Sequence, residues 1–202
     1  MKPTLYAFDL DDTLIYSESK VELIRNGKTI ELAPSEFAHY IKQSGDVLDF
    51  SQFQNILGQF DNIGIEDMLN FFTRKLQQSM VEAGLHVAIV TARSQDTFSS
   101  LLDFFEFYFR YIKKFDYSTS KRLLSHIEYK GLEDPSPLAK KEHIEGYITG
   151  EKVDQIGIER VYFYDDSVDN VKAVDSLREE YPNTEIYTYA IRDGKPYKYT
   201  LM

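Results

Sequence analysis

The chain reads L-Y-A-F-D-L-D-D-T-L over residues 5–14, and this stretch decides how the rest of the sequence is interpreted. Its first four residues form a short apolar run, which predicts a buried strand that ends at Asp9. Asp11 and Asp12 follow, so that three of the four residues from position 9 to 12 are acidic. Carboxylates clustered at the end of a buried strand are unfavourable unless something positive lies between them. This cluster is the first indication of a bound cation.

The same kind of strand ending occurs twice more along the chain. Residues 85–90 form a strand-like run that leads into Thr91, and residues 161–164 form one that leads into Asp165 and Asp166. Helical patterns separate these strands, and a last strand follows them: the helices cover 65–83, 97–114, about 138 onward and 168–180, and the strand covers 184–191. Part of the aromatic segment 97–114 also suits a strand, and residues 117–137 follow no clear pattern.

Strands that alternate with helices predict an α/β fold, here a Rossmann-like, mainly parallel sheet with helices on both faces. Such a sheet places ligand sites beyond the carboxyl ends of its strands. We therefore expect the polar residues at Asp9, Thr91 and Asp165 to converge at one edge of the sheet.

Residues 21–32 read V-E-L-I-R-N-G-K-T-I-E-L and predict a β-hairpin, because both positions of an Asn-Gly turn favour positive φ. A two-residue turn pairs Arg25 with Lys28 at the tip, and behind them Leu23 with Ile30 and Val21 with Leu32. Two cations so close in sequence to Asp9 predict a flap in which Arg25 and Lys28 help to hold an anionic substrate. The alternative is a solvated turn that happens to be basic.

The length of 202 residues suits one domain over residues 1–202. Within it, residues 16–80 hold the hairpin flap and a small helical insertion, with helix expected from Pro34 to Lys42 and again from Phe53. We expect this insertion to form a small helical cap that leaves the site open.

The ordered series of motifs resembles the haloacid dehalogenase-like hydrolase superfamily. Its first motif is an apolar strand followed by DxDx[TV], which residues 9–13 match, and Thr91 resembles its second motif. Asp165 and Asp166 resemble the acidic fourth motif, and a lysine at a helix start would supply the third. The resemblance covers most of the chain and is weakest between about 95 and 140. A lone DxDxT is a weak signal, so its weight comes from this context.

This resemblance implies a magnesium-dependent phosphatase that works through an aspartyl-phosphate. Asp9 would attack phosphorus, and Asp11 would protonate the leaving group and later activate water. Lys140, in the sequence Leu-Ala-Lys-Lys, would neutralise Asp9 and the phosphate. Lys141 is the close second choice for this role and Lys130 a distant third.

The expected metal is Mg²⁺, held by oxygen ligands. The resemblance assigns it to Asp9, the backbone carbonyl of Asp11, and Asp166, with Asp165 supporting the site. The register of this acidic pair is open by one residue. Alignment on Asp166 puts Asn170 at the last acidic position of the motif and leaves Asp169 on the surface.

The phosphoryl oxygens would be bound by the hydroxyl of Thr91 and by backbone N–H groups near Leu10 and Ala92. Arg93 adds charge at this edge or is an ordinary surface arginine. For Asp12 we expect solvent contact or a helix cap. The histidines show no metal-ligand spacing and are interpreted as structural.

Composition limits the function further. The net charge of −10 disfavours a broad cationic face for duplex nucleic acid, and the absence of cysteine excludes disulfides and thiol chemistry. The start has no signal-like apolar segment, and no apolar run approaches the roughly 18 residues of a membrane span. We expect a cytoplasmic protein without a membrane partner, whose substrate is a phosphorylated small molecule or a nucleic-acid end. A phosphotransferase, a receiver-like domain and a non-catalytic phospho-ligand binding module are the alternatives.

Overall fold

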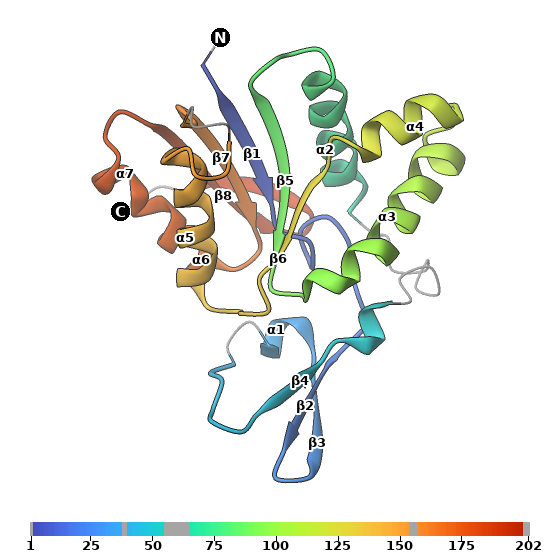
Figure 1. Ribbon diagram of the computed structural model, residues 1–202, viewed down its shortest axis with the longest axis vertical. Coiled ribbons are helices and arrows are strands. Elements are labelled where there is room, and N and C mark those ends of the chain that lie inside the picture. Colours follow the sequence, from blue (N-terminus) through green and yellow to red (C-terminus); the bar gives the residue numbers. More distant parts are fainter. Residues whose placement is uncertain (1, 38–39, 55–64, 154–156, 200–202) are drawn as a thin grey trace.

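The computed structural model describes residues 2–37, 40–54, 65–153 and 157–199, and a six-stranded sheet forms its centre (Figure 1). In spatial order the strands are β6 (Glu128–Gly131), β5 (Leu85–Thr91), β1 (Thr4–Phe8), β7 (Arg160–Asp165), β8 (Glu185–Arg192) and β9 (Lys195–Lys198). The first five are parallel, and β9 pairs antiparallel with β8. The predicted α/β class and mainly parallel sheet are confirmed.

Helices cover both faces of this sheet, as predicted (Figure 1). One face carries α2 (Glu66–Ser79), α3 (Phe98–Phe107) and α4 (Tyr117–Leu124), and the other carries α5 (Pro137–Ile148), α6 (Val168–Asp175) and α7 (Leu177–Glu180). A hydrophobic core lies on each face of the sheet. Because side chains alternate across a strand, Phe8 packs into the core beneath α2, α3 and α4, and Ala7 packs into the core beneath α5, α6 and α7. No helix among the described residues combines the length and hydropathy of a membrane span.

The aromatic segment after β5 is helical rather than extended. After α3 the chain continues through a π-helical turn, η4 (Tyr108–Ile112). Phe105 and Phe109, four residues apart, are both fully buried, because that spacing places them on one helical face. The sequence reading missed α4, β6 and β9, which are short and carry no continuous apolar run.

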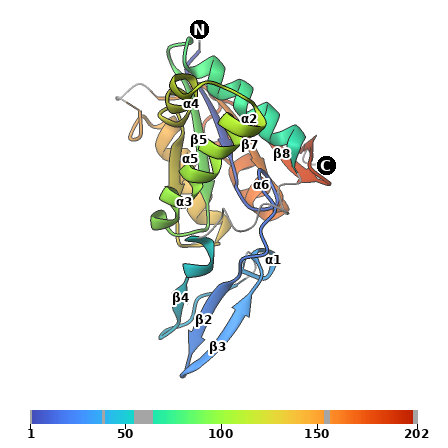
Figure 2. The same cartoon turned by 90° about the vertical axis from the view of Figure 1, so that its right-hand side faces the viewer.

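A second sheet lies beyond the carboxyl edge of the first one (Figure 2). It holds β2 (Val21–Arg25), β3 (Lys28–Leu32) and β4 (Val47–Asp49) in the antiparallel order β3-β2-β4. The predicted hairpin register is confirmed: Arg25 pairs with Lys28, Leu23 with Ile30 and Val21 with Leu32. We call the described residues 16–37 and 40–54 the cap.

The cap is mainly a sheet. A helix begins at Pro34 as expected, but residues 40–42, the end of the expected helix, are not helical. Its helices are α1 (Pro34–Phe37) and the short 3₁₀ turn η1 (Ser51–Gln54). Residues 38–39 and 55–64, where further helix was expected, lie outside the described residues. The third strand, β4, has only three residues, too few for its pattern to predict a strand, and it forms because β2 offers a free edge.

Candidate functional site

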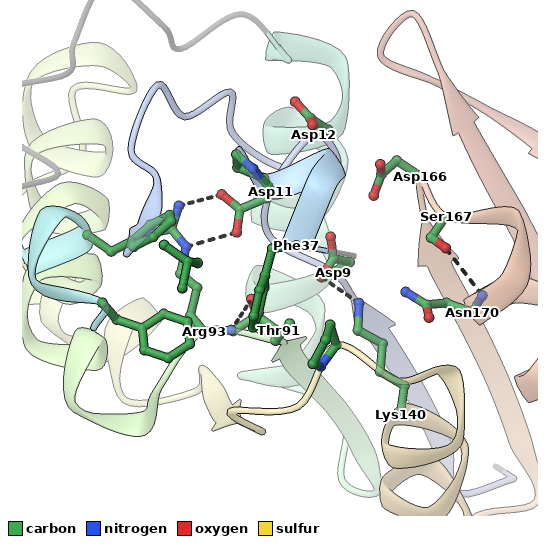
Figure 3. A pocket seen from close by; sticks show the side chains of 16 residues that line it. Asp9, Asp11, Asp12, Phe37, Thr91, Arg93, Lys140, Asp166, Ser167 and Asn170 are labelled. Atoms are coloured by element: carbon green, nitrogen blue, oxygen red, sulfur yellow. Dashed lines mark hydrogen bonds and ion pairs between the residues drawn. The ribbon is translucent and has the colours of Figure 1, made fainter. Parts of the chain in front are cut away.

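A pocket opens where the carboxyl ends of β1, β5 and β7 meet the cap (Figure 3). The sheet side supplies a mostly polar lining, with Ala92 and Pro135 as its apolar members: Asp9, Asp11, Asp12, Thr91, Ala92, Arg93, Pro135, Lys140, Asp166, Ser167 and Asn170. The cap supplies Val21, Pro34, Phe37, Phe50 and Phe53. The predicted convergence of three strand ends at one edge is confirmed.

Lys140 is the cation at the centre of the site. It lies in the first turn of α5, where the Ser136 hydroxyl caps the helix by accepting from the Ala139 N–H. Its Nζ donates to Asp9 Oδ1 at 2.6 Å and to Asp165 Oδ2 at 2.7 Å. Lys141 follows about 100° further around the helix and pairs at the surface with Glu180. The structure therefore brings the first-choice lysine to the acidic cluster.

The site holds more negative charge than Lys140 balances. Burial raises the pKa of Asp9 well above its usual range; Lys140 opposes this rise, and Asp165, Asp166 and Asp11 add to it. Burial alone would lower the pKa of Lys140, but its contacts with Asp165 and Asp9 raise it, so the lysine is charged. Three carboxylates around one ammonium leave room for a further positive charge.

The two acids after β7 have different environments. Asp165 is fully buried and accepts from Lys140, from the Ser167 N–H at 2.9 Å and from Asn170 Nδ2 at 3.0 Å. The Asp166 carboxylate accepts no hydrogen bond from any described residue. It lies beside the pocket across from Asp9 (Figure 3), and burial, followed by the charge of Asp165, raises its pKa to about 7.

Three carboxylates of this cluster could hold a metal ion. Asp9, Asp165 and Asp166 each offer an oxygen, and these oxygens all lie within 4.8 Å of one another. Asp165 already accepts three hydrogen-bond donors, so Asp166 is the acid with free lone pairs. Asp169 is exposed and faces Lys172 at 3.5 Å, as the alignment on Asp166 predicted.

Arg93 is a buried member of the site, so its interpretation as a surface arginine is wrong. Only 2% of its side chain is exposed. Its Nε donates to Asp11 Oδ2 at 2.8 Å and its Nη2 to Asp11 Oδ1 at 2.5 Å. The Phe53 ring of the cap lies 4.2 Å from the guanidinium carbon, and Nη1 is buried without a partner among the described residues. Arg93 therefore connects Asp11 to the cap.

The remaining predicted phosphate-binding residues lie at or next to the pocket. The Thr91 hydroxyl is buried and accepts from the Arg93 N–H at 3.2 Å, which leaves its own hydrogen available to a ligand. Ala92 lines the pocket. The side chain of Leu10 is buried in the core, and its carbonyl accepts from the N–H groups of Leu14 and Ile15. This turn returns the chain toward the cap.

Asp12 differs from its expected place in solvent or at a helix end. It has a positive φ of 55° and lines the pocket. Burial, followed by the charge of Asp11, raises its pKa. The tight turn after β1 causes this placement, because the Asp12 N–H donates to the Ile15 carbonyl.

The hairpin tip does not reach the site, so the assignment of Arg25 and Lys28 to substrate binding is corrected. The tip points away from the sheet edge (Figure 2), and neither side chain lines the pocket. Arg25 instead donates to both oxygens of Asp46, at 2.7 and 2.8 Å. The Asp46 side chain is 1% exposed and needs a counter-charge, which Arg25 provides. Lys28 is exposed.

The sequence reading missed the aromatic wall of the pocket. Phe37, Phe50 and Phe53 of the cap are at most 8% exposed and line the site. They lie in a segment whose apolar residues follow neither a helical nor a strand period, so no pattern marks them.

Comparison of the chain with protein-family models, curated proteins and solved structures finds no match. The geometry of the site therefore carries the functional argument.

Proposed function

We propose that this chain is a magnesium-dependent phosphomonoester hydrolase of the haloacid dehalogenase-like type, acting through an aspartyl-phosphate on Asp9. One observation carries the proposal: Lys140 bridges Asp9 and Asp165 at the end of the central strand, with Asp11 and Asp166 facing the same pocket. The strand order β6-β5-β1-β7-β8 supports a Rossmann-like core, in which ligands bind beyond the carboxyl ends of the strands.

Asp9 is suited to the nucleophile's role. One of its oxygens, Oδ1, is held by Lys140, which fixes the carboxylate and leaves Oδ2 without a hydrogen bond from any described residue. In the first step Oδ2 forms a bond to phosphorus as the bond between phosphorus and the leaving-group oxygen breaks. The Thr91 hydroxyl, which already accepts from Arg93, donates to a phosphoryl oxygen.

Asp11 is suited to proton transfer. In the first step it gives a proton to the leaving-group oxygen, and in the second it takes one from the water that attacks phosphorus and releases Asp9. Arg93 holds both oxygens of Asp11. This clamp fixes the plane of the carboxylate, and we assign Arg93 as a positioning residue.

The donor set fits a hard divalent cation. Carboxylate oxygens are the ligands such a cation prefers, and the cluster has uncompensated negative charge. Asp9 and Asp166 would hold the ion together with the Asp11 carbonyl, and Asp165 would orient Lys140. When bound, Mg²⁺ neutralises charge on the phosphoryl group.

The test is hydrolysis of an aryl phosphate with magnesium and with EDTA. Asp9→Asn should lower turnover by at least about a thousandfold while keeping the fold, because an amide forms no acyl-phosphate at a useful rate. Borohydride reduction of the wild-type protein during turnover should convert Asp9 to homoserine, which peptide mass spectrometry detects. Near wild-type turnover by pure Asp9→Asn protein would refute the proposal.

The metal assignment has its own matched control. Asp166→Ala should raise the magnesium concentration needed for half-maximal activity much more than Asp169→Ala, because only Asp166 faces the pocket. Binding of Mn²⁺, followed by its paramagnetic resonance signal, should weaken in the same order. The opposite order would show that the ligand has been assigned to the wrong acid.

A further inference from the structure

The cap side of the pocket is apolar throughout its described part. Val21, Pro34, Phe37, Phe50 and Phe53 form this wall. The rings of Phe37 and Phe50 meet edge to face at 5.6 Å, and those of Phe50 and Phe53 lie 6.2 Å apart. A leaving group that reaches this wall finds no described side chain that can pair with a charge.

The cations of the pocket are already committed. Among the described residues that line it, only Arg93 and Lys140 are cationic, and each is bonded to a carboxylate. Two basic residues of the cap are also paired: Lys20 with Glu31 at 2.8 Å and Arg25 with Asp46 at 2.7 Å. A second anionic group on a substrate would therefore meet no described pocket cation that is free of a carboxylate, which is unfavourable where that group is buried.

The size of the pocket determines where the rest of a substrate must lie. Its cavity volume is about 50 Å³, enough for only a few water-sized groups, so a phosphoryl group nearly fills it. A larger hollow of about 530 Å³ has one lining residue, Phe50, in common with it. Four acids line that hollow against a single cation, Lys42: Asp46, Asp49, Asp96 and Glu133. Asp46 is neutralised by Arg25, and the other three repel a second anion.

We infer that the site selects phosphomonoesters whose leaving group carries no negative charge. The inference rests on the proposed hydrolase function and specifies its substrate class. The transferred phosphoryl group meets Lys140 and Thr91, whereas any further anion meets an apolar wall or an acidic hollow. Nucleic-acid ends, nucleoside diphosphates and bisphosphorylated compounds are thereby excluded, in contrast to the nucleic-acid end expected from an open site.

The test compares two esters that differ in one charge, 4-carbamoylphenyl phosphate and 4-carboxyphenyl phosphate. For the wild-type protein with magnesium, kcat/KM should be at least about tenfold higher for the neutral carbamoyl ester. The difference should shrink as salt is added, because Asp96 and Glu133 of the hollow are exposed. An oligonucleotide with a terminal phosphate should be hydrolysed at least as poorly as the carboxyl ester.

The two esters also differ in intrinsic reactivity, and this difference is the same for every variant of the protein. Comparing variants at one position of the wall therefore isolates the effect of the wall. Pro34 is half-buried at the start of α1, where a long side chain fits more easily than among the packed rings. Pro34→Lys should raise the ratio of kcat/KM for the carboxyl ester over the carbamoyl ester about fivefold, whereas Pro34→Gln, which is neutral and one atom shorter, should leave it unchanged. Circular dichroism checks that both variants fold.

The outcomes separate the two claims. Equal kcat/KM for both esters, or efficient hydrolysis of the oligonucleotide phosphate, overturns the inference and leaves the hydrolase function standing. An unchanged ratio in folded Pro34→Lys protein overturns the placement of the leaving group against the cap. No hydrolysis of either ester with magnesium overturns the proposed function itself.

Discussion

Asp9 at the edge of the sheet and Asp46 in the cap are both buried carboxylates that contact a cation, yet their environments are opposite. Asp46 accepts both guanidinium bonds of Arg25, the Tyr40 hydroxyl and the Gln43 N–H. The Arg25 guanidinium holds the pKa of Asp46 well below its ordinary value, although burial opposes this. The pKa of Asp9 is raised by burial and by the neighbouring acids that Lys140 cannot balance.

This difference separates a structural ion pair from a site prepared for a ligand. The cap has one buried carboxylate with all its lone pairs satisfied, so nothing remains to be bound there. The sheet edge has several carboxylates for one lysine, an arrangement that is unfavourable in isolation and becomes favourable when a cation binds.

The largest effect should come from Lys140→Ala. Removing the ammonium that lies between Asp9 and Asp165 should lower turnover by roughly a thousandfold or more. It should also leave two buried carboxylates without this counter-charge, at a cost of about 3–5 kcal/mol of unfolding free energy. Urea denaturation and aryl phosphate hydrolysis measure the two effects. Lys141→Ala is the control and should change stability by less than about 0.5 kcal/mol. Equal losses in both variants would contradict the central role of Lys140.

The next effect concerns the clamp on Asp11. Arg93→Ala should lower kcat by about 10- to 100-fold and change KM less than about threefold, because Arg93 orients Asp11 without contacting the leaving group. Arg93→Lys should recover only part of kcat, since an ammonium cannot make both bonds at once. Exposed Arg74 provides the control variant. A loss confined to KM would make Arg93 a substrate-binding residue instead.

Asp166 at the sheet edge and Asp46 in the cap should make opposite contributions to the pH dependence of stability, measured in EDTA. The pKa of Asp166 is raised from 3.8 to about 7, so its contribution to stability is present at low pH and lost as pH rises from about 4 to 7. The pKa of Asp46 is lowered, so its contribution is present above pH 4 and lost as pH falls. In thermal melting, the Asp166→Asn variant should not show the loss of stability as pH rises from about 4 to 7. The Asp46→Asn variant should not show the loss of stability as pH falls below 4. If both carboxylates changed stability in the same direction with pH, the contrast between the environments of Asp166 and Asp46 would be wrong.

The smallest effect is expected at the hairpin tip. Arg25→Ala should speed proteolysis within the cap by on the order of tenfold, since it leaves Asp46 without its counter-charge. Lys28→Ala should have no such effect. Neither variant, nor the double variant, should change KM by more than about twofold, because the tip lies outside the pocket. A raised KM in the Lys28→Ala protein would restore the flap hypothesis.

Local patterns were sufficient to predict several parts of the molecule. The apolar runs before Asp9, Thr91 and Asp165 predicted three buried strands, because a strand buried on both faces is apolar at every position. Parallel strands end at the same edge, so the convergence of these residues followed from the prediction of a mainly parallel sheet. The hairpin register followed from Asn26 and Gly27, whose positive φ values of 51° and 73° define the turn.

Other features depend on contacts between segments that are distant in the sequence. The choice of Lys140 over Lys141 depends on where α5 begins, since one residue rotates a side chain by about 100°. The sequence shows that Arg25 is charged but not that Asp46, 21 residues away, neutralises it. Likewise, Arg93 becomes buried only because Asp11 and Phe53 enclose it from the core and the cap.

The sequence by itself determined the sheet class, the hairpin and the edge where the acids gather, because strand periodicity and turn chemistry act within a few residues. The tertiary structure alone decided that Arg93 holds Asp11 and that aromatic rings of the cap line the pocket, and it places Lys140, the lysine expected, between Asp9 and Asp165. Those properties depend on burial and on pairing between distant residues, and a charge or an aromatic ring acquires its role only from the groups that surround it.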